Sequence, residues 1–199
     1  MFGSIFSVAA ASAALSQSTG DKVGKDKIET LKRFGFLPLD ERDRILSSGV
    51  KNLAELPNYQ LASAAQLKAH RLFPAVSITS QELEQSLTLS KHNGRNEALE
   101  ELSRKGRMLA PDEEVSGWWQ IEQSNLDRLI ANESVLLGVI GGYIKEAATI
   151  VEAISRSSYQ NRVSLIIKPI TGKELEAYRG YIPGVRQGTR YVFPLPQSK

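Results

Sequence analysis

Residues 133–156, ESVLLGVIGGYIKEAATIVEAISR, are the most apolar stretch of the chain, and residues 135–144 carry almost no polar side chain. We predict one long helix here, covered on several sides, because a helix that is apolar all round must be buried. Gly138 and Gly142 lie four residues apart and would let another backbone approach closely. The stretch therefore predicts a central core helix, with contact to a second copy of the chain as an additional role.

The chain before this stretch has apolar residues at helical spacing over most of its length. Capping residues support two of the expected helices, with Asp40 before one and the pair Thr79 and Glu82 at the start of another. Trp118 and Trp119 follow a helical period after Pro111, where they either pack in the core or anchor an interface. We predict helices over residues 25–34, 40–46, 58–73, 79–93, 95–109 and 111–130.

After residue 157 the apolar spacing changes from a helical period toward the alternation of a strand. Residues 162–170 and 190–195 are expected to be strands, and residues 173–179 a short helix between them. The predicted fold class is mainly α, a multi-helix bundle with a small C-terminal β-containing unit of strand, helix and strand. The predicted domains are an apolar head over 1–20, flexible or cleaved, a helical body over 21–157, and a basic C-terminal unit over 158–199 packed on the body.

The charge of the chain is divided unevenly along its length. Residues 1–155 carry 17 Lys and Arg against 20 Asp and Glu, whereas residues 156–199 carry 8 against 2. The C-terminal segment is thus strongly basic although the net charge of the whole chain is only +3. A local excess of positive charge attracts phosphates or another anionic surface, whatever the total charge.

Cationic and aromatic residues alternate in this basic segment, and two glycines flank Arg186. Guanidinium groups bind phosphate in bidentate fashion and tyrosine rings stack on bases, so the pattern suits RNA or single-stranded DNA. The alternative is a solvated sheet face whose cations pair with the acidic body. The candidate binding residues are Lys168, Lys173, Arg179, Tyr181, Arg186, Arg190 and Tyr191.

The sequence contains no motif of a known catalytic chemistry. It has no cysteine and two histidines, His70 and His92, 22 residues apart without an adjacent ligand pattern. The glycine-rich segment 20–26 lacks the spacing of a phosphate-binding loop and has an acid where a hydroxyl is needed. We therefore predict a protein that is not an enzyme, with no cofactor, no metal ion and no identifiable small-molecule substrate; an enzyme that uses buried carboxylates is the alternative.

The first twenty residues carry no charge, and residues 5–15 are apolar and small. An exported protein whose signal is cleaved near Ala13 is one interpretation, although the positive n-region of a signal peptide is missing. Insertion of residues 1–16 into an anionic membrane surface is another. The segment also resembles the heads of small viral and phage minor structural proteins, which implies a role in assembly.

These observations together predict a structural or assembly protein, of the viral or phage kind, that self-associates through its helices as a homo-oligomer. Its basic C-terminal unit would contact nucleic acid or an acidic partner. A cytoplasmic or virion location follows from this hypothesis, and an exported helical protein is the alternative.

Overall fold

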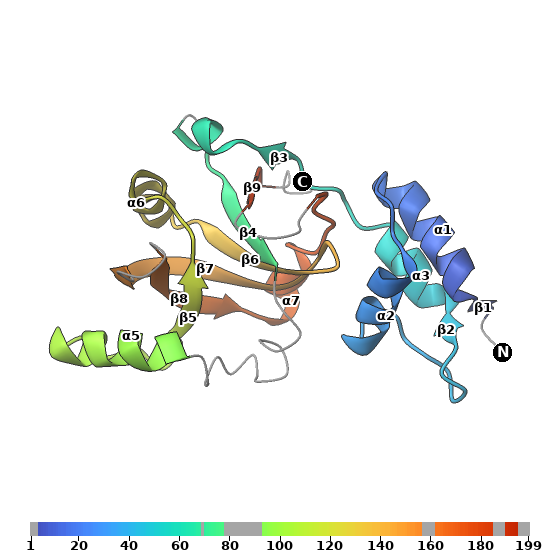
Figure 1. Cartoon of the computed structure of the whole chain (residues 1–199), viewed down its shortest axis with the longest axis horizontal. Helices are drawn as coiled ribbons and strands as arrows, with labels where there is room; N and C mark the ends of the chain where they lie inside the picture. Colours follow the sequence, from blue (N-terminus) through green and yellow to red (C-terminus); the bar gives the residue numbers. More distant parts are fainter. Residues whose placement is uncertain (1–3, 69, 78–92, 157–161, 185–189, 195–199) are drawn as a thin grey trace.

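A seven-stranded mixed sheet lies at the centre of the molecule. The computed structural model describes residues 4–68, 70–77, 93–156, 162–184 and 190–194. Of these residues, 36% are helical and 29% lie in strands, so the predicted mainly α bundle is wrong. Figure 1 shows two parts, a group of helices at the N-terminal end and a larger part built around the sheet.

The strands of this sheet lie in the order β3-β9-β4-β6-β7-β8-β5. Only the β4–β6 pair is parallel, and the other neighbouring strands are antiparallel. The strands are β3 (Leu61–Ala62), β4 (Phe73–Ser77), β5 (Glu114–Trp119), β6 (Val135–Ile140), β7 (Tyr143–Arg156), β8 (Val163–Ile170) and β9 (Arg190–Val192). The predicted strands over 162–170 and 190–195 are confirmed as β8 and β9.

The apolar stretch predicted as one long helix is instead the hairpin of β6 and β7. Gly141 and Gly142 connect Ile140 to Tyr143 with φ angles of +58° and +93°. A two-residue hairpin turn with positive φ at both positions is the connection that glycine pairs favour. All six residues of β6 are buried, and a strand buried on both faces has the same continuous apolar sequence as a buried helix.

The predicted helix over 111–130 is also wrong in its first half. β5 occupies residues 114–119, and the helix α6 (Gln123–Ala131) begins only after it. Valine and tryptophan favour strands, and β5 forms because these residues pair with β8. In α6, the buried residues Leu126 and Leu129 have helical spacing.

Two further predicted helices are replaced by turns, a short 3₁₀ helix and strands. Residues 58–73 form β3, the short 3₁₀ helix η1 (Ala64–Lys68) and the start of β4, because pairing with β9 satisfies their backbone groups. Residues 40–44 form a turn before the short strand at residues 45–46, and in this turn the Asp40 carboxylate accepts from the Arg42 and Arg44 amides and the Arg44 guanidinium. The Arg44 hydrogen bond is the main reason that the pKa of Asp40 falls to about 2.

Helices cover both faces of the sheet, with α6 on one side and α5 (Asn93–Arg104) on the other (Figure 1). The helix α5 confirms the prediction over 95–109, and α7 (Gly172–Glu176) confirms the short helix expected after β8. The apolar side chains of α6 and η1 pack on one face, and those of α5 and of the segment around α7 pack on the other. The helix expected over 79–93 falls almost entirely outside the described residues.

The N-terminal part, here called the helical unit, consists of residues 4–56. Its helices α1 (Val8–Thr19), α2 (Lys25–Arg33) and α3 (Ser47–Ala54) surround a core of their own, beside the two-stranded pair β1 (Ile5–Phe6) and β2 (Ile45–Leu46). The helix α2 confirms the prediction over 25–34. Ser7 caps α1, and Ala11 and Leu15 are fully buried, so residues 8–19 are a packed helix of this unit.

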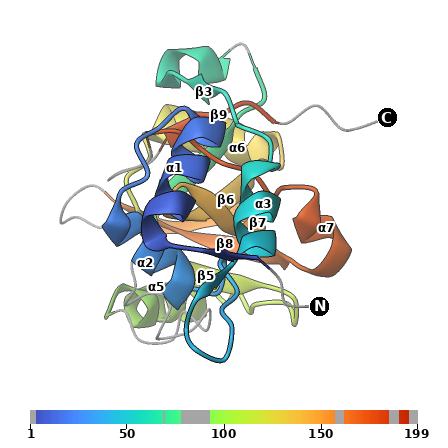
Figure 2. The ribbon, with the colours of Figure 1, turned by 90° about the vertical axis from the view of Figure 1, so that its right-hand side faces the viewer.

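The helical unit packs against the sheet near the β6–β7 turn, and it lies in front of the sheet in Figure 2. Tyr143 and Tyr181 belong to the helical unit's core, and the Tyr143 ring lies 6.1 Å from that of Phe36. Lys145 Nζ donates to the carbonyl of Phe34 at 3.2 Å. The core of the helical unit therefore meets the sheet at the aromatic side chains Tyr143 and Tyr181.

Candidate anion-binding pocket

The cationic residues predicted to form a C-terminal binding surface lie at separate places. Lys168 on β8 forms a salt bridge with Asp112 at 3.2 Å, and Lys173 is exposed on α7. Arg179 donates to the carbonyls of Ile144 and Lys145 and pairs with Glu176. Arg190 is exposed at the start of β9, and Arg186 lies outside the described residues.

The two tyrosines of that predicted set are buried. Tyr181 is 1% exposed and Tyr191 8% exposed, so neither offers a free ring face. Burial raises the pKa of both phenols. The Tyr181 hydroxyl donates to Asp21 Oδ2 at 2.7 Å and accepts from Lys27 Nζ at 3.0 Å, which links the sheet to the helical unit.

The residues predicted as core or oligomer contacts all lie in or beside the sheet. Trp118 pairs with Ser164 in the β5–β8 ladder, and Trp119 is half-buried with its indole N–H donating to Ser116 Oγ at 2.8 Å. Gly138 is buried in β6. Gly142 lies in the β6–β7 turn against the ring of Tyr181, which is a core contact.

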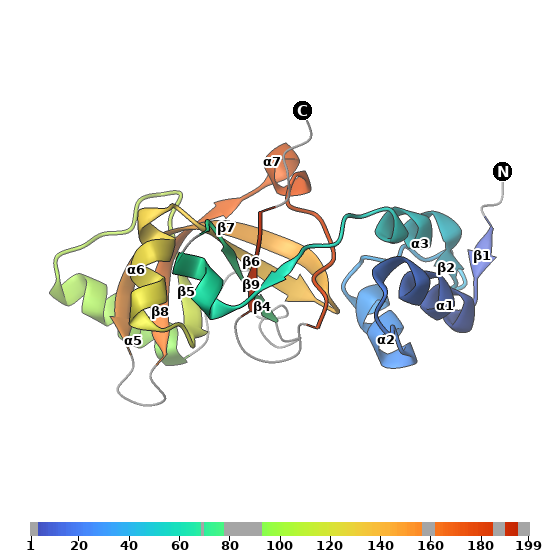
Figure 3. The ribbon, with the colours of Figure 1, turned by 90° about the horizontal axis from the view of Figure 1, so that it is seen from above.

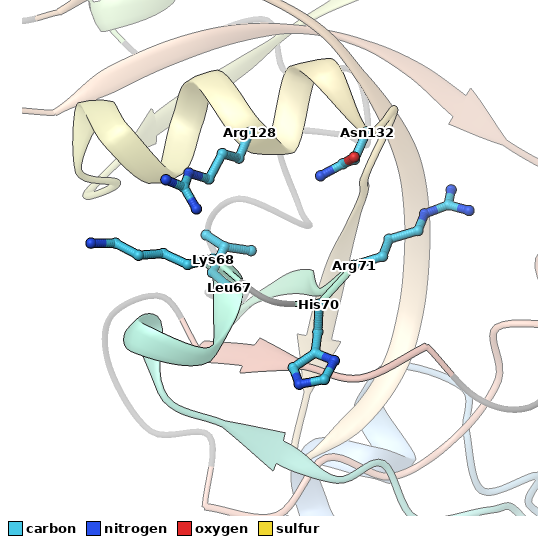
Figure 4. Close-up of a pocket in the computed structure, with 6 residues that line it drawn as sticks. All are labelled: Leu67, Lys68, His70, Arg71, Arg128 and Asn132. Atoms are coloured by element: carbon cyan, nitrogen blue, oxygen red, sulfur yellow. The ribbon is translucent and has the colours of Figure 1, made fainter.

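A pocket of about 270 Å³ lies between η1 and the C-terminal end of α6. Cationic side chains dominate its wall, and no acidic side chain of the described residues lines it. Figure 4 shows Lys68 and Arg128 on one side of this hollow and Arg71 and His70 on the other. The lining residues are Leu67, Lys68, His70, Arg71, Arg128 and Asn132.

Buried leucines position both walls of the pocket. Leu67 of η1 and Leu126 and Leu129 of α6 pack in the same core on this face of the sheet. Figure 3 shows η1 beside α6, and the two elements are in contact. Because these leucines face the core, Lys68 and Arg128 lie at the surface between the two elements.

The cations of the pocket differ in how far they are neutralised. Arg71 donates to the carbonyl of Glu133 at 3.3 Å, and its guanidinium lies 5.5 Å from the ring centre of Phe73. Within the described part of the chain, neither Lys68 nor Arg128 forms a salt bridge. Guanidinium and ammonium groups without a carboxylate partner are available to an anion, and arginine matches the geometry of phosphate.

The sequence carried a local signal for this pocket that our interpretation did not use. Residues 68–71 read Lys-Ala-His-Arg, but we assigned them to the end of a helix over 58–73. Arg128 is 57 positions further along, so only the packing of α6 on η1 brings it to them.

The end of α6 holds a backbone conformation that glycine would adopt with less strain. The Ser134 amide donates to Leu129 O at 2.8 Å and the Glu133 amide to Ile130 O at 3.0 Å, while Glu133 has φ +47°. This is the left-handed C-terminal cap at which glycine is favoured. We expect Glu133→Gly to raise the free energy of unfolding by about 0.5–1 kcal/mol, measured by urea denaturation. An unchanged or lower midpoint would contradict this expectation.

Comparison with protein-family models, with curated proteins and with solved structures gives no match to this chain. Among the residues that the structure describes, no group of three or more histidine or acidic side chains is placed to hold a metal ion. The helices in the described ranges include none that is long and apolar enough to cross a membrane.

Proposed function

We propose that this protein binds nucleic acid, and that the pocket between η1 and α6 holds a phosphate of the nucleic-acid backbone. The observation that carries the proposal is the pair of cations Lys68 and Arg128, which have no carboxylate partner among the described residues and lie in a pocket wall without a described carboxylate. Phosphate contacts supply most of the affinity of such complexes, and lysine and arginine make them.

Packing also supports the assignment to a ligand rather than to an internal ion pair. The apolar parts of η1 and α6 are buried beneath the pocket, so the elements do not need their charged side chains to hold together. Two like charges that face one hollow repel each other, and a bound anion removes that repulsion. Self-association through helices and a role in a virion stay predictions.

Fluorescence anisotropy of a labelled oligonucleotide tests the proposal. We expect binding at low salt that weakens steeply between about 50 and 200 mM salt, because binding releases counterions. Lys68→Gln and Arg128→Gln should each reduce the affinity about three- to tenfold and lower the salt slope by about 1. Both side chains lie at the surface, so circular dichroism should show an unchanged fold.

Lys173→Gln and Arg190→Gln are the matched controls. They remove one exposed charge each, and Lys173 on α7 and Arg190 on β9 lie outside the pocket lining. Equal losses of affinity in all four variants would show only unspecific attraction of the oligonucleotide to a basic protein. Losses confined to the two controls would move the site to the C-terminal segment, and no binding at low salt would overturn the proposal.

A further inference from the structure

Two aromatic rings meet at the edge of the cationic pocket. His70, which lines the pocket, lies with its imidazole 5.5 Å from the phenyl ring of Phe193, and the ring planes are at 72°. His70 is exposed and Phe193 is half-buried. Figure 4 shows the imidazole pointing away from α6, so the ring and the Arg128 guanidinium lie on opposite sides of the hollow.

The fold holds this pair from two directions. The Phe193 amide donates to Gln60 O at 3.1 Å and the ring packs against the core beneath α6. The His70 amide donates to Gln66 O at 3.2 Å, which ties it to the end of η1. The contact with Phe193 restricts the His70 ring before binding, and a restricted ring loses less conformational entropy when a ligand stacks on it.

Two other aromatic rings of the described residues near the pocket are buried. Phe73 lies under the Arg71 guanidinium but is 5% exposed, and Tyr191 is 8% exposed. Of these three residues, His70 is the one whose ring is exposed beside Lys68 and Arg128, the two cations without a carboxylate partner in the described ranges.

We infer that the pocket selects single-stranded nucleic acid, with one unpaired base stacked on His70 while the neighbouring phosphate lies between Lys68 and Arg128. This inference rests on the proposed function and adds that the nucleic acid is single-stranded. Base stacking on aromatic side chains is how proteins hold single strands without reading their sequence. A duplex keeps its bases stacked on one another, so it offers the pocket its phosphates only.

The test compares three ligands of equal length: a single strand, an abasic strand with the same phosphates, and a duplex. The wild-type protein should bind the single strand about 5- to 100-fold more tightly than the abasic strand, which is the range expected for one stacked base. His70→Gln should weaken binding of the single strand and abolish this preference. His70→Phe, which keeps an aromatic ring without ring nitrogens, should retain the preference.

Arg128→Gln is the reciprocal control, because the loss of a phosphate contact weakens all three ligands by the same factor. If the wild-type protein binds the abasic strand as tightly as the single strand, stacking on His70 is refuted and the phosphate site stands. The same conclusion follows if His70→Gln weakens both strands equally. If none of the three ligands binds at low salt, the proposed function itself fails.

Discussion

Replacing Gly142 with alanine is expected to lower the free energy of unfolding by roughly 2–5 kcal/mol. Gly142 has φ +93°, which L side chains rarely adopt, and a Cβ atom there would lie 2.9 Å from Tyr181 Cζ and closer still to Cε2. Tyr181 cannot move aside cheaply, because its ring is buried beside Tyr143 and its hydroxyl is held by two partners. Backbone strain and steric overlap therefore act together at this turn.

Gly172→Ala separates these two causes. Gly172 also has positive φ, +59°, but a Cβ there would meet no atom within 4 Å. Gly172→Ala should therefore lower the free energy of unfolding by the strain of the left-handed conformation alone, roughly 1–2 kcal/mol. Urea denaturation of both variants measures the difference. A loss in the Gly142 variant no larger than in the Gly172 variant would show that the turn is not packed against Tyr181 in solution.

Tyr181→Phe is expected to lower the free energy of unfolding by about 1–3 kcal/mol, because it removes the hydroxyl between Asp21 and Lys27. Lys27 Nζ loses its acceptor while it stays half-buried, where burial already lowers the pKa of the ammonium group. The Tyr181 ring, 5.2 Å from Lys27 Nζ, remains in place and retains the cation–π contact. The loss therefore reports on the hydroxyl rather than on packing.

Tyr59→Phe is the matched control, since Tyr59 is also buried and donates to a single neutral acceptor, Tyr178 O, at 2.9 Å. It should cost about 0.5–1.5 kcal/mol. A double-mutant cycle of Tyr181→Phe with Lys27→Met should give a coupling of about 1 kcal/mol. No coupling, with equal losses in the two tyrosine variants, would mean that the hydroxyl does not stabilise the junction between the helical unit and the sheet.

Local patterns predicted some elements correctly and others with the wrong type. The helices over 25–34 and 95–109 and the strand over 162–170 are amphipathic or β-branched enough for spacing alone to define them. Residues 135–140 are apolar at every position, which a buried helix and a buried strand share. The informative detail was the adjacent pair Gly141-Gly142, which favours a two-residue hairpin turn. We instead paired Gly142 with Gly138 and predicted a close approach of another backbone.

The candidate site shows the same division. The basic run at residues 68–71 is visible in the sequence, whereas Arg128 and Phe193 reach it only through the packing of α6 and the pairing of β9 with β3 and β4. The prediction of a C-terminal binding surface rested on composition alone. It could not show that Tyr181 and Tyr191 point into cores or that Asp112 lies beside Lys168.

The sequence by itself determined that this chain folds around an apolar core, that its amphipathic helices begin near residues 25 and 95, and that its C-terminal segment is basic. These properties depend on residues close together in the chain. Only the tertiary structure decided that residues 133–156 are a hairpin in a seven-stranded sheet and that Lys68 and Arg128 lie together in one pocket wall. Strand pairing and ion pairing join residues far apart in sequence, and no local pattern records their partners.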